Sequence, residues 1–333
     1  MPELILFFSF LLSFLLALYG TPIARKTALR YNLLDVPDGE LKKHDEPVPY
    51  MGGVIVYFAL ISPLSLLFEF NKELLGILFS SSILLIVGLF DDFKALTPRI
   101  KFLFQIMATY ILLKSGIYIQ VIYLPQWLNT GLSFLWIMTM VNAFNIIDIM
   151  DGLVASVGMV IAVVIFVISL FQSNFLISII SLSLAAALAG FLKFNWQPAK
   201  IFLGDAGSMV LGLLFGSLTI MVSYTRFNRL AFVSAVQILA IPLFDLLYVM
   251  MLRLLKKKSP FLGSPDHFAL RLKKRFDWSS GKTVGFILAI QFVLAGIALV
   301  NFFSTPTVTV IGCLFSIFFF IGFGWWLAKV AME

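Results

Sequence analysis

Two neighbouring carboxylates, Asp91 and Asp92, follow an apolar stretch of the chain, and Lys94 and Lys101 come soon after them. Two adjacent carboxylates repel each other unless a cation or a proton lies between them. Mg²⁺ is such a cation, because it takes oxygen ligands and usually shares them with substrate phosphates. The pair therefore indicates a site for a metal ion and a phosphate group. The simpler alternative is a solvated helix end.

A second polar pattern recurs every three residues, at Asn142, Asn145, Asp148 and Asp151, in a stretch that is otherwise apolar. On an α-helix, residues three apart lie on nearly the same face. The spacing therefore predicts a polar ridge along a membrane helix. The alternative is an interhelical hydrogen-bond seam of the kind that Asn forms in membranes, although two Asp residues in a seam would need partners of their own.

A third motif, Phe-Leu-Gly-Asp-Ala-Gly-Ser at 202–208, directly precedes another apolar span. Gly204 and Gly207 allow the backbone to approach a ligand closely. The start of the helix that follows favours an anion such as phosphate, and Asp205 is well placed there to bind a metal ion. An ordinary helix N-cap, a position at which Asp is favoured, is the alternative interpretation.

The longest hydrophilic stretch, 253–282, carries His267, one of only two histidines in the chain; the other is His44. Asp266 precedes His267 directly, and Arg271 follows shortly after. This grouping of a histidine with charged neighbours indicates phosphate contact about as strongly as it indicates a plain surface position. The same stretch mixes aromatic and aliphatic residues with its cations, which predicts a short amphipathic helix on the membrane surface.

Two further features are less specific. The segment 42–53 reads Lys-Lys-His-Asp-Glu-Pro-Val-Pro-Tyr-Met-Gly-Gly and enters an apolar span through its two glycines. It is either a structured loop of the site or only a basic loop that orients the protein in the membrane. Asp245 lies inside a span and has two interpretations, a hydrogen bond within the bundle or contact with a lipid phosphate.

The elements that position these side chains must lie in a membrane. Of the 333 residues, 61% are hydrophobic and only 12% are charged, with a mean hydropathy of +1.02. A soluble chain is roughly 45–50% apolar and about 25% charged. We therefore expect an all-α, polytopic membrane bundle of about eleven helices, each close to the length that crosses a bilayer. The expected spans are 3–20, 50–68, 74–90, 100–114, 131–145, 153–171, 174–194, 207–224, 230–252, 283–302 and 307–328.

The distribution of Lys and Arg around these spans predicts which loops face the cytoplasm. All but four of the 24 lie on the side of the 21–49 loop; the exceptions are Lys72, Lys114, Arg226 and Arg229. That side is therefore expected to be cytoplasmic, with the N-terminus outside and the C-terminus inside. The carboxylates of the three acidic motifs fall at the same face. The net charge of +7 follows from this insertion rule and does not indicate nucleic-acid binding.

Five motifs in this order resemble those of the polyprenyl-phosphate N-acetylhexosamine-1-phosphate transferases, glycosyltransferase family 4. They are KKHDEPVPYMGG at 42–53, GLFDDFKALTPRIK at 88–101, NAFNIIDIMDGL at 142–153, FLGDAGS at 202–208 and the Asp-His pair at 266–267. The first motif is more similar to the WecA/TagO-like branch than to the related peptidoglycan translocase. Two positions depart from the usual pattern, because Ile149 replaces a glycine and His267 stands where two or three histidines are common.

The resemblance implies one integral membrane transferase domain over 1–333, in the plasma membrane. Its cytoplasmic loops 21–49, 91–100, 146–152, 195–206 and 253–282 would form the active site. The implied reaction transfers N-acetylhexosamine 1-phosphate, in this branch GlcNAc 1-phosphate, from a UDP-sugar to undecaprenyl phosphate and releases UMP. Mg²⁺, or Mn²⁺ in its place, is the implied cofactor, and a homodimer is the implied assembly.

The resemblance also implies a role for individual residues. The expected catalytic residues are Asp91, Asp92 and Asp148, and the expected metal ligands are Asp205 and Asn145. The residues expected to bind substrate are Lys43, Lys94, Lys101, Asn142, Asp151, Gly204, His267 and Arg271. Phosphoryl transfer needs alignment and charge neutralisation more than covalent chemistry, which such a set of acidic, basic and amide groups would supply.

Alternatives exist for both the donor and the class of protein. The same fold could use UDP-GalNAc or UDP-MurNAc-pentapeptide. An anion transporter would also suit polar residues within spans, but a carrier places ionisable groups near the midplane of the membrane, where only Asp245 is a candidate. A non-catalytic scaffold would not need three intact acidic motifs.

Overall fold

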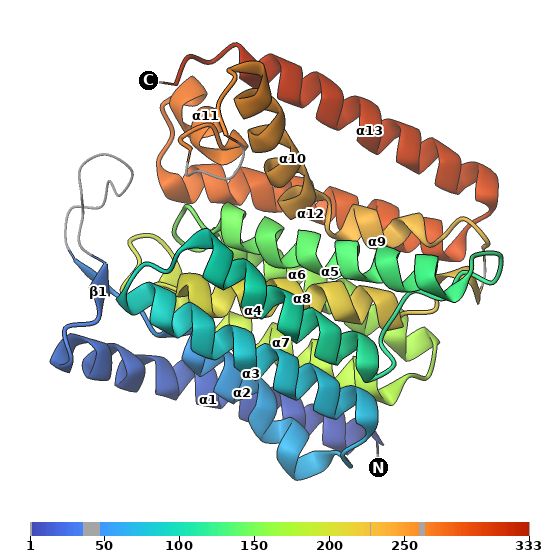
Figure 1. The fold of residues 1–333 in the computed structure, drawn as a ribbon, viewed down its shortest axis with the longest axis horizontal. Helices are drawn as coiled ribbons and strands as arrows, with labels where there is room; N and C mark the ends of the chain where they lie inside the picture. Colours follow the sequence, from blue (N-terminus) through green and yellow to red (C-terminus); the bar gives the residue numbers. More distant parts are fainter. Residues whose placement is uncertain (1, 36–46, 227, 260–263, 333) are drawn as a thin grey trace.

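The computed structural model describes residues 2–35, 47–226, 228–259 and 264–332. Within these ranges nearly all regular structure is helical, and the helices lie side by side in one bundle (Figure 1). The only strands described are β1 (Leu34–Asp35) and β2 (Val48–Pro49), which pair antiparallel with Leu34 opposite Pro49. The expectation of an all-α membrane bundle is confirmed at this level.

The described chain contains thirteen α-helices and one 3₁₀ turn. They are α1 (Pro2–Arg30), α2 (Gly52–Leu67), α3 (Lys72–Phe93), α4 (Pro98–Lys114), α5 (Gln126–Ile147), α6 (Leu153–Phe171), α7 (Phe175–Asn195), α8 (Gly204–Met221), η1 (Tyr224–Arg226), α9 (Val233–Ile238), α10 (Ala240–Leu255), α11 (Phe268–Phe276), α12 (Ser280–Phe303) and α13 (Pro306–Ala328). Eight of the described helices are long and apolar enough to cross a membrane, namely α1, α3, α5, α6, α7, α8, α12 and α13. Each predicted span contains helix, and the number of crossings stays a prediction.

Three elements differ from the sequence-based expectation. The predicted span 230–252 is divided, because α9 ends at Ile238 and α10 begins at Ala240. Gln291 of α12 donates a hydrogen bond from Nε2 to the carbonyl oxygen of Ile238 (3.0 Å), which satisfies a backbone group at this break. The first helix also continues to Arg30, well into the predicted 21–49 loop. The expected amphipathic helix exists as α11, but Phe268, Ala269 and Leu272 on its apolar face are buried in protein, and among its apolar residues only Phe276 at its end is exposed.

The segments that carry the candidate motifs lie at one end of the bundle (Figure 1, left). The ends of α3, α5 and α7 meet the starts of α4, α6 and α8 there, and α11 lies at the same end. The C-terminus is also at this end, while the N-terminus is at the opposite one. The two termini therefore lie on different sides, and which side is cytoplasmic stays a prediction.

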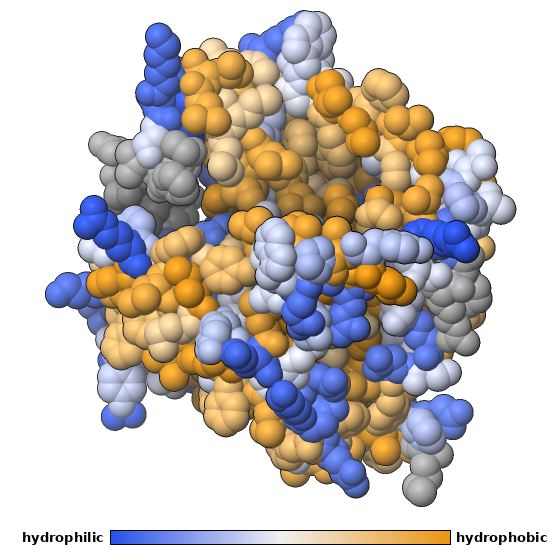
Figure 2. Space-filling view, turned by 45° about the vertical axis from the view of Figure 1, so that its right-hand side comes forward, coloured by the Kyte–Doolittle hydropathy of each residue, from blue (hydrophilic) through white to orange (hydrophobic). Residues whose placement is uncertain are grey.

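The interior of the bundle is formed by α6, α7 and α8, whose apolar windows are 72%, 78% and 83% buried. At the periphery, α1 and α13 are only 22% and 17% buried. Hydrophobic residues cover much of the outer surface (Figure 2). Exposed apolar helices are stable when lipid surrounds them, because every backbone group is bonded within its own helix.

Candidate active site

A lysine bridges two of the acidic motifs. Lys101, near the start of α4, places its Nζ 2.5 Å from Oδ2 of Asp91 and 2.6 Å from Oδ2 of Asp205. Asp91 lies at the end of α3 and Asp205 in the first turn of α8. The ammonium group therefore offsets the repulsion between two carboxylates that are far apart in sequence. We call Asp91, Lys101, Asp205 and Asn145, which is described below, the acidic cluster.

Asp92 points to the start of α8. Its Oδ1 accepts a hydrogen bond from the backbone N–H of Asp205 (2.8 Å) and its Oδ2 one from that of Ala206 (3.3 Å). Asp92 thus caps α8 from a neighbouring helix, while Leu203 in the N-cap position provides no side-chain bond. Gly204 has a φ of +75°, and a Cβ there would lie 2.5 Å from Oδ2 of Asp92, so glycine is required. Asp205 is therefore not the ordinary N-cap of the alternative interpretation.

The two asparagines of α5 have different surroundings. Asn145 donates from Nδ2 to Oδ1 of Asp205 (2.9 Å) and to Oγ of Ser208 (3.0 Å), which joins α5 to α8. Asn142 donates to Oε1 of Gln105 (3.1 Å), a buried residue of α4. Asn145 therefore belongs to the acidic cluster, whereas Asn142 lies in an interhelical hydrogen-bond seam. Sequence reasoning missed Gln105, although it follows Lys101 by four positions on the same face of α4.

The predicted ridge of four polar residues on one helix is wrong for its last two members. The helix α5 ends at Ile147, and Asp148 has a non-helical ψ of 64°. Asp151 lies in the following turn, where its Oδ2 accepts the backbone N–H of Ala199 (2.9 Å). Asp and Gly are typical turn residues, and Gly152, with a φ of +74°, is the N-cap residue before α6. Asp151 therefore fastens this turn to the loop that leads to α8.

The carboxyl group of Asp148, in the turn after α5, is electrostatically perturbed. Burial raises its pKa to about 8, and the negative charges of Asp205 and Asp151 add to the shift. At neutral pH the group is therefore mainly protonated in the absence of a nearby cation. Its side chain still keeps partial contact with solvent. Asp148 can accordingly serve as a hydrogen-bond donor, and a bound cation would favour its ionised form.

Glycines allow the helices that carry the site to approach one another. A Cβ on Gly88 of α3 would lie 2.3 Å from Cα of Ala206 in α8. Similarly, the backbone of Gly207 comes so close to Gly53 of α2 that no side chain fits between them. The N–H of Gly53 also donates to the carbonyl oxygen of Leu203 (2.8 Å). The motif at 42–53 and the motif at 202–208 are thus joined through their backbones.

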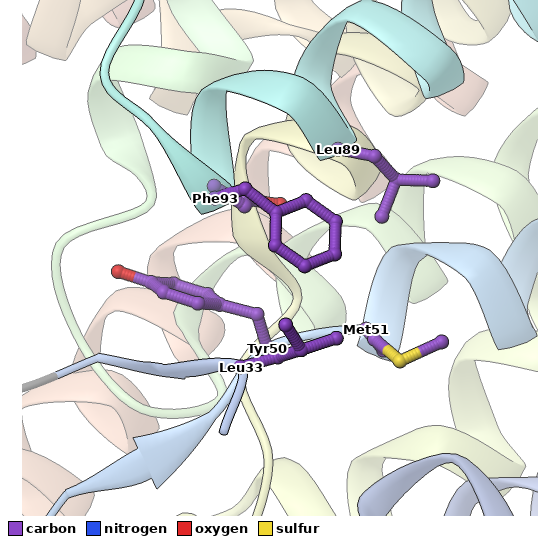
Figure 3. Close-up of a pocket in the computed structure, with 6 residues that line it drawn as sticks. Leu33, Tyr50, Met51, Leu89 and Phe93 are labelled. Carbon is purple, nitrogen blue, oxygen red and sulfur yellow. The ribbon is translucent and has the colours of Figure 1, made fainter. Parts of the chain in front are cut away.

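A small pocket lies beside Asp92 (Figure 3). Its lining is Leu33, Tyr50, Met51, Leu89, Asp92 and Phe93. In Figure 3 the side chains of Leu89 and Phe93 lie on one side of it and those of Leu33, Tyr50 and Met51 on the other. Burial raises the pKa of Tyr50, and its hydrogen bond with Asp35 adds to the shift. Met51 has a φ of +91°, a strained value for a residue other than glycine. The sequence analysis included Tyr50 in the 42–53 motif but gave no role to it or to Asp35.

The remaining expected substrate residues are not joined to the acidic cluster. Lys43 lies outside the described residues, and Lys94 is exposed at the end of α3. His267 and Arg271 are 6% and 2% exposed, and their hydrogen bonds within the described ranges go elsewhere. Arg271 bonds to Asp266 and to carbonyl oxygens at and just after the end of α13. Direct substrate contact by any of these four residues therefore stays a prediction.

The donor atoms of the acidic cluster suit a hard cation. No group of three or more His, Cys, Asp or Glu side chains is arranged for a metal ion within the described ranges. Mg²⁺ usually needs only one or two carboxylates, because waters and substrate phosphates complete its shell. Asp205 and the amide oxygen of Asn145 supply such a partial set, and Asp91 contacts the same ammonium group of Lys101 as Asp205. These residues therefore fit an Mg²⁺ ion whose coordination is shared between the protein and the substrate phosphates.

Comparison with known proteins gives the family. The model of glycosyl transferase family 4 matches residues 74–223, a range that contains the whole acidic cluster. A Thermotoga maritima protein named undecaprenyl-phosphate alpha-N-acetylglucosaminyl 1-phosphate transferase is 32% identical over 256 residues, which cover 77% of this chain and 76% of that one. A Bacillus subtilis protein named probable undecaprenyl-phosphate N-acetylglucosaminyl 1-phosphate transferase is 29% identical and covers 97% of this chain and 91% of its own.

The peptidoglycan branch is also represented among the relatives. A Caldicellulosiruptor bescii protein named phospho-N-acetylmuramoyl-pentapeptide-transferase is 28% identical over 87% of this chain and 96% of its own. All three relatives match over most of their length, so the likeness includes the helices beyond the family model as well as the acidic motifs. This chain belongs to glycosyl transferase family 4.

Proposed function

We propose that the protein transfers GlcNAc 1-phosphate from UDP-GlcNAc to undecaprenyl phosphate, which yields undecaprenyl-diphospho-GlcNAc and UMP. The observation that carries this proposal is the lysine-bridged pair of Asp91 and Asp205 at one end of a membrane bundle. The pair lies within the range that matches the family model, and relatives of near full length are named for this reaction. The product would start the synthesis of a cell-envelope polysaccharide.

The proposed reaction is a single exchange at phosphorus. An oxygen of the lipid phosphate attacks the phosphorus that bears the sugar, and the bond from that phosphorus to the UMP oxygen breaks. The electron pair of this bond leaves with UMP, so atoms and charges balance without a redox partner. Such transfer depends on alignment and on neutralising the crowded phosphate charge.

The acidic cluster supplies groups for both tasks. Lys101 is positioned to neutralise phosphate oxygens, and Asp91 and Asp205 hold its ammonium group in place. Asp92 acts indirectly, because it fixes the start of α8, where the positive end of the helix dipole favours an anion. Asp148, mainly protonated at neutral pH, can donate a hydrogen bond to a phosphate oxygen.

We propose Asp205 and Asn145 as the residues that hold Mg²⁺, with Mn²⁺ as a substitute. When bound, the ion would neutralise and orient the donor diphosphate. Asp91 would keep Lys101 beside the same phosphates. Asp92 would act on this arrangement only through the backbone N–H groups of α8 that it holds.

The proposed setting is the cytoplasmic face of the plasma membrane. The apolar outer surface gives the prenyl chain of the acceptor a lipid-like environment. The lipid phosphate would then lie at the interface, at the end of the bundle that carries the acidic cluster. UDP-sugars are made in the cytoplasm, so the donor would reach this end from the aqueous side. The homodimer stays a prediction.

Release of UMP by the purified protein tests this proposal. The protein in detergent is mixed with undecaprenyl phosphate, Mg²⁺ and one donor at a time: UDP-GlcNAc, UDP-GalNAc or UDP-MurNAc-pentapeptide. We expect UMP from UDP-GlcNAc alone, and none from the Asp205→Asn variant or after the metal ion is removed. UMP from UDP-MurNAc-pentapeptide instead would favour the second candidate, for which the Caldicellulosiruptor bescii relative is named. Folded protein that releases no UMP from any donor would contradict the proposal.

A further inference from the structure

Asp245 is a carboxylate that the proposed chemistry does not use. It lies in α10 and is fully buried, with an exposure of 0%. A carboxylate within a membrane protein is costly unless it is paired, and such residues are usually functional. Its partners should therefore indicate what it does.

Both oxygens of Asp245 are engaged by the start of α11. Oδ2 lies 2.7 Å from Nδ1 of His267, and Oδ1 accepts the backbone N–H of Phe268 (3.0 Å). The Phe268 N–H fixes Oδ1 as an acceptor, and we assign the proton of the second contact to Nδ1, so that Oδ2 accepts as well. The imidazole then has Nε2 as its remaining nitrogen, and no hydrogen bond to Nε2 occurs within the described ranges.

The backbone around His267 is fastened by a second set of contacts. Arg271, one turn further along α11, donates from Nη2 to Oδ1 of Asp266 (2.5 Å) and from Nη1 to the carbonyl oxygen of Val330 (2.5 Å). Lys256 donates to both oxygens of Asp266 at 2.8 Å. These bonds fix the helix that carries His267, but they do not touch its ring. Among the described residues, the hydrogen-bond partner of the His267 ring is Asp245.

The pair lies at the same end of the bundle as the acidic cluster (Figure 1). The helix α10 packs against α5, which carries Asn145. The helix α11 lies at the end of the bundle where the motif-bearing segments meet (Figure 1). A histidine that a buried carboxylate holds in one tautomer is a common arrangement where the second ring nitrogen must meet a ligand.

We infer that Asp245 is a positioning residue that holds His267 with Nδ1 protonated, so that Nε2 accepts a hydrogen bond from a hydroxyl or the amide N–H of the sugar of the nucleotide-sugar donor. This inference rests on the proposed function and deepens it. The alternative is that the pair serves only to join α10 to α11, in which case the state of Nε2 would have no effect on turnover.

Nitrogen NMR of the imidazole tests the tautomer directly. The chain has only two histidines, so a His44→Gln variant labelled with ¹⁵N-histidine gives the signals of His267 alone. We expect the pattern of a ring protonated at Nδ1, and a shift of the Nε2 signal when UDP-GlcNAc is added to saturation. A ring protonated only at Nε2, or an Nε2 signal that UDP-GlcNAc at saturation leaves unchanged, would overturn the inference.

Kinetics of three variants test the coupling. Asp245→Asn and His267→Gln should each lower kcat/KM for UDP-GlcNAc by about tenfold or more. The double variant should lose no more than His267→Gln alone, because Asp245 acts through the ring. Losses that multiply in the double variant, or a folded Asp245→Asn protein with normal kcat/KM, would refute the inference. If Asp245→Asn does not fold, the inference is still tested by the NMR signals of the His44→Gln variant and by the kinetics of His267→Gln.

Asp266→Asn is the matched control, because Asp266 is a buried, ion-paired carboxylate next to His267 that does not contact its ring. This variant should melt at a lower temperature and keep the Nδ1-protonated pattern. A changed pattern would show that the fold of the loop, not Asp245, sets the tautomer. Failure of the proposed function would look different, because the native protein itself would then release no UMP.

Discussion

Replacing Gly88 by alanine would place a methyl group between α3 and α8, where the structure has no space for it. The added Cβ would lie 2.3 Å from Cα and 2.4 Å from N of Ala206. Non-bonded carbon atoms pack at about 3.5–4.0 Å, so the two helices would have to separate by about 1 Å or more. The obstacle is backbone, which cannot rotate away as the end of a side chain can.

The separation should affect stability and turnover together. Overpacking of this kind costs about 1–3 kcal/mol. It would also stretch the 2.8 Å bond from the N–H of Asp205 to Asp92 and displace Asp205 from Lys101. A displacement of about 1 Å in a catalytic group can cost about 100-fold in rate. We therefore expect Gly88→Ala to lower both the melting temperature and kcat, the latter by about 100-fold.

Gly296→Ala in α12 is the matched control, because a Cβ there meets nothing within 4 Å. Alanine is the better helix former, so this variant should keep native activity and melt at the same or a higher temperature. Both proteins are purified in detergent and compared by UMP release and thermal melting. Native kcat and melting temperature in Gly88→Ala would refute the close packing of α3 on α8 that this account requires.

Changes at three charged residues should have distinguishable effects. Lys101→Met should lower kcat about 100-fold or more, because Asp91 and Asp205 lose their ammonium partner; UMP release at native levels would contradict this. In a metal-free buffer, the melting temperature should fall as the pH rises from about 5 to 8 and level off above that, because the folded chain keeps a proton on Asp148, pKa about 8, that the unfolded chain has already released. Asp148→Asn should weaken this fall, and an unchanged slope would show that Asp148 is ionised throughout. Asp266 should have the opposite pH dependence. Burial tends to raise its pKa, but Lys256 and Arg271 bring the pKa below its usual value. The stabilisation that the ionised Asp266 provides is therefore lost as the pH falls below about 4. The melting temperature of Asp266→Asn should fall less in acid than that of the native protein. An equal fall in both proteins would refute this role of Asp266.

The sequence predicted most of the helices because a membrane demands long apolar segments, and few other structures meet that demand. It did not predict the break between α9 and α10. Pro242, in the first turn of α10, was the available signal, since its missing N–H suits a helix start. Yet Pro22 and Pro63 lie inside α1 and α2 without dividing them. Proline alone was therefore an ambiguous signal, and the partner at the break, Gln291, is distant in sequence.

The candidate site was predictable in its residue types and much less so in its geometry. Neighbouring residues on a helix point about 100° apart, so the pair at 91–92 had to divide its roles, and only packing determined that Asp91 meets Lys101 while Asp92 caps α8. The three-residue spacing predicted Asp148 on the helix, but the turn-forming Asp151 and Gly152 beside it were the better signal, since α5 ends at Ile147. The pairing of Asp245 with His267 depends on how α11 folds back on α10, which no local pattern encodes.

The most direct test of the central claim follows the two phosphorus atoms of the donor. UDP-GlcNAc labelled with ³²P in either the α or the β phosphate is incubated with the protein, undecaprenyl phosphate and Mg²⁺, and the lipid is then extracted. Transfer of the phosphosugar predicts that the β label enters the lipid while the α label stays in water as UMP, in the native protein but not in Asp205→Asn. Release of UDP with both labels left in water would contradict the account, because the sugar alone would then have been transferred.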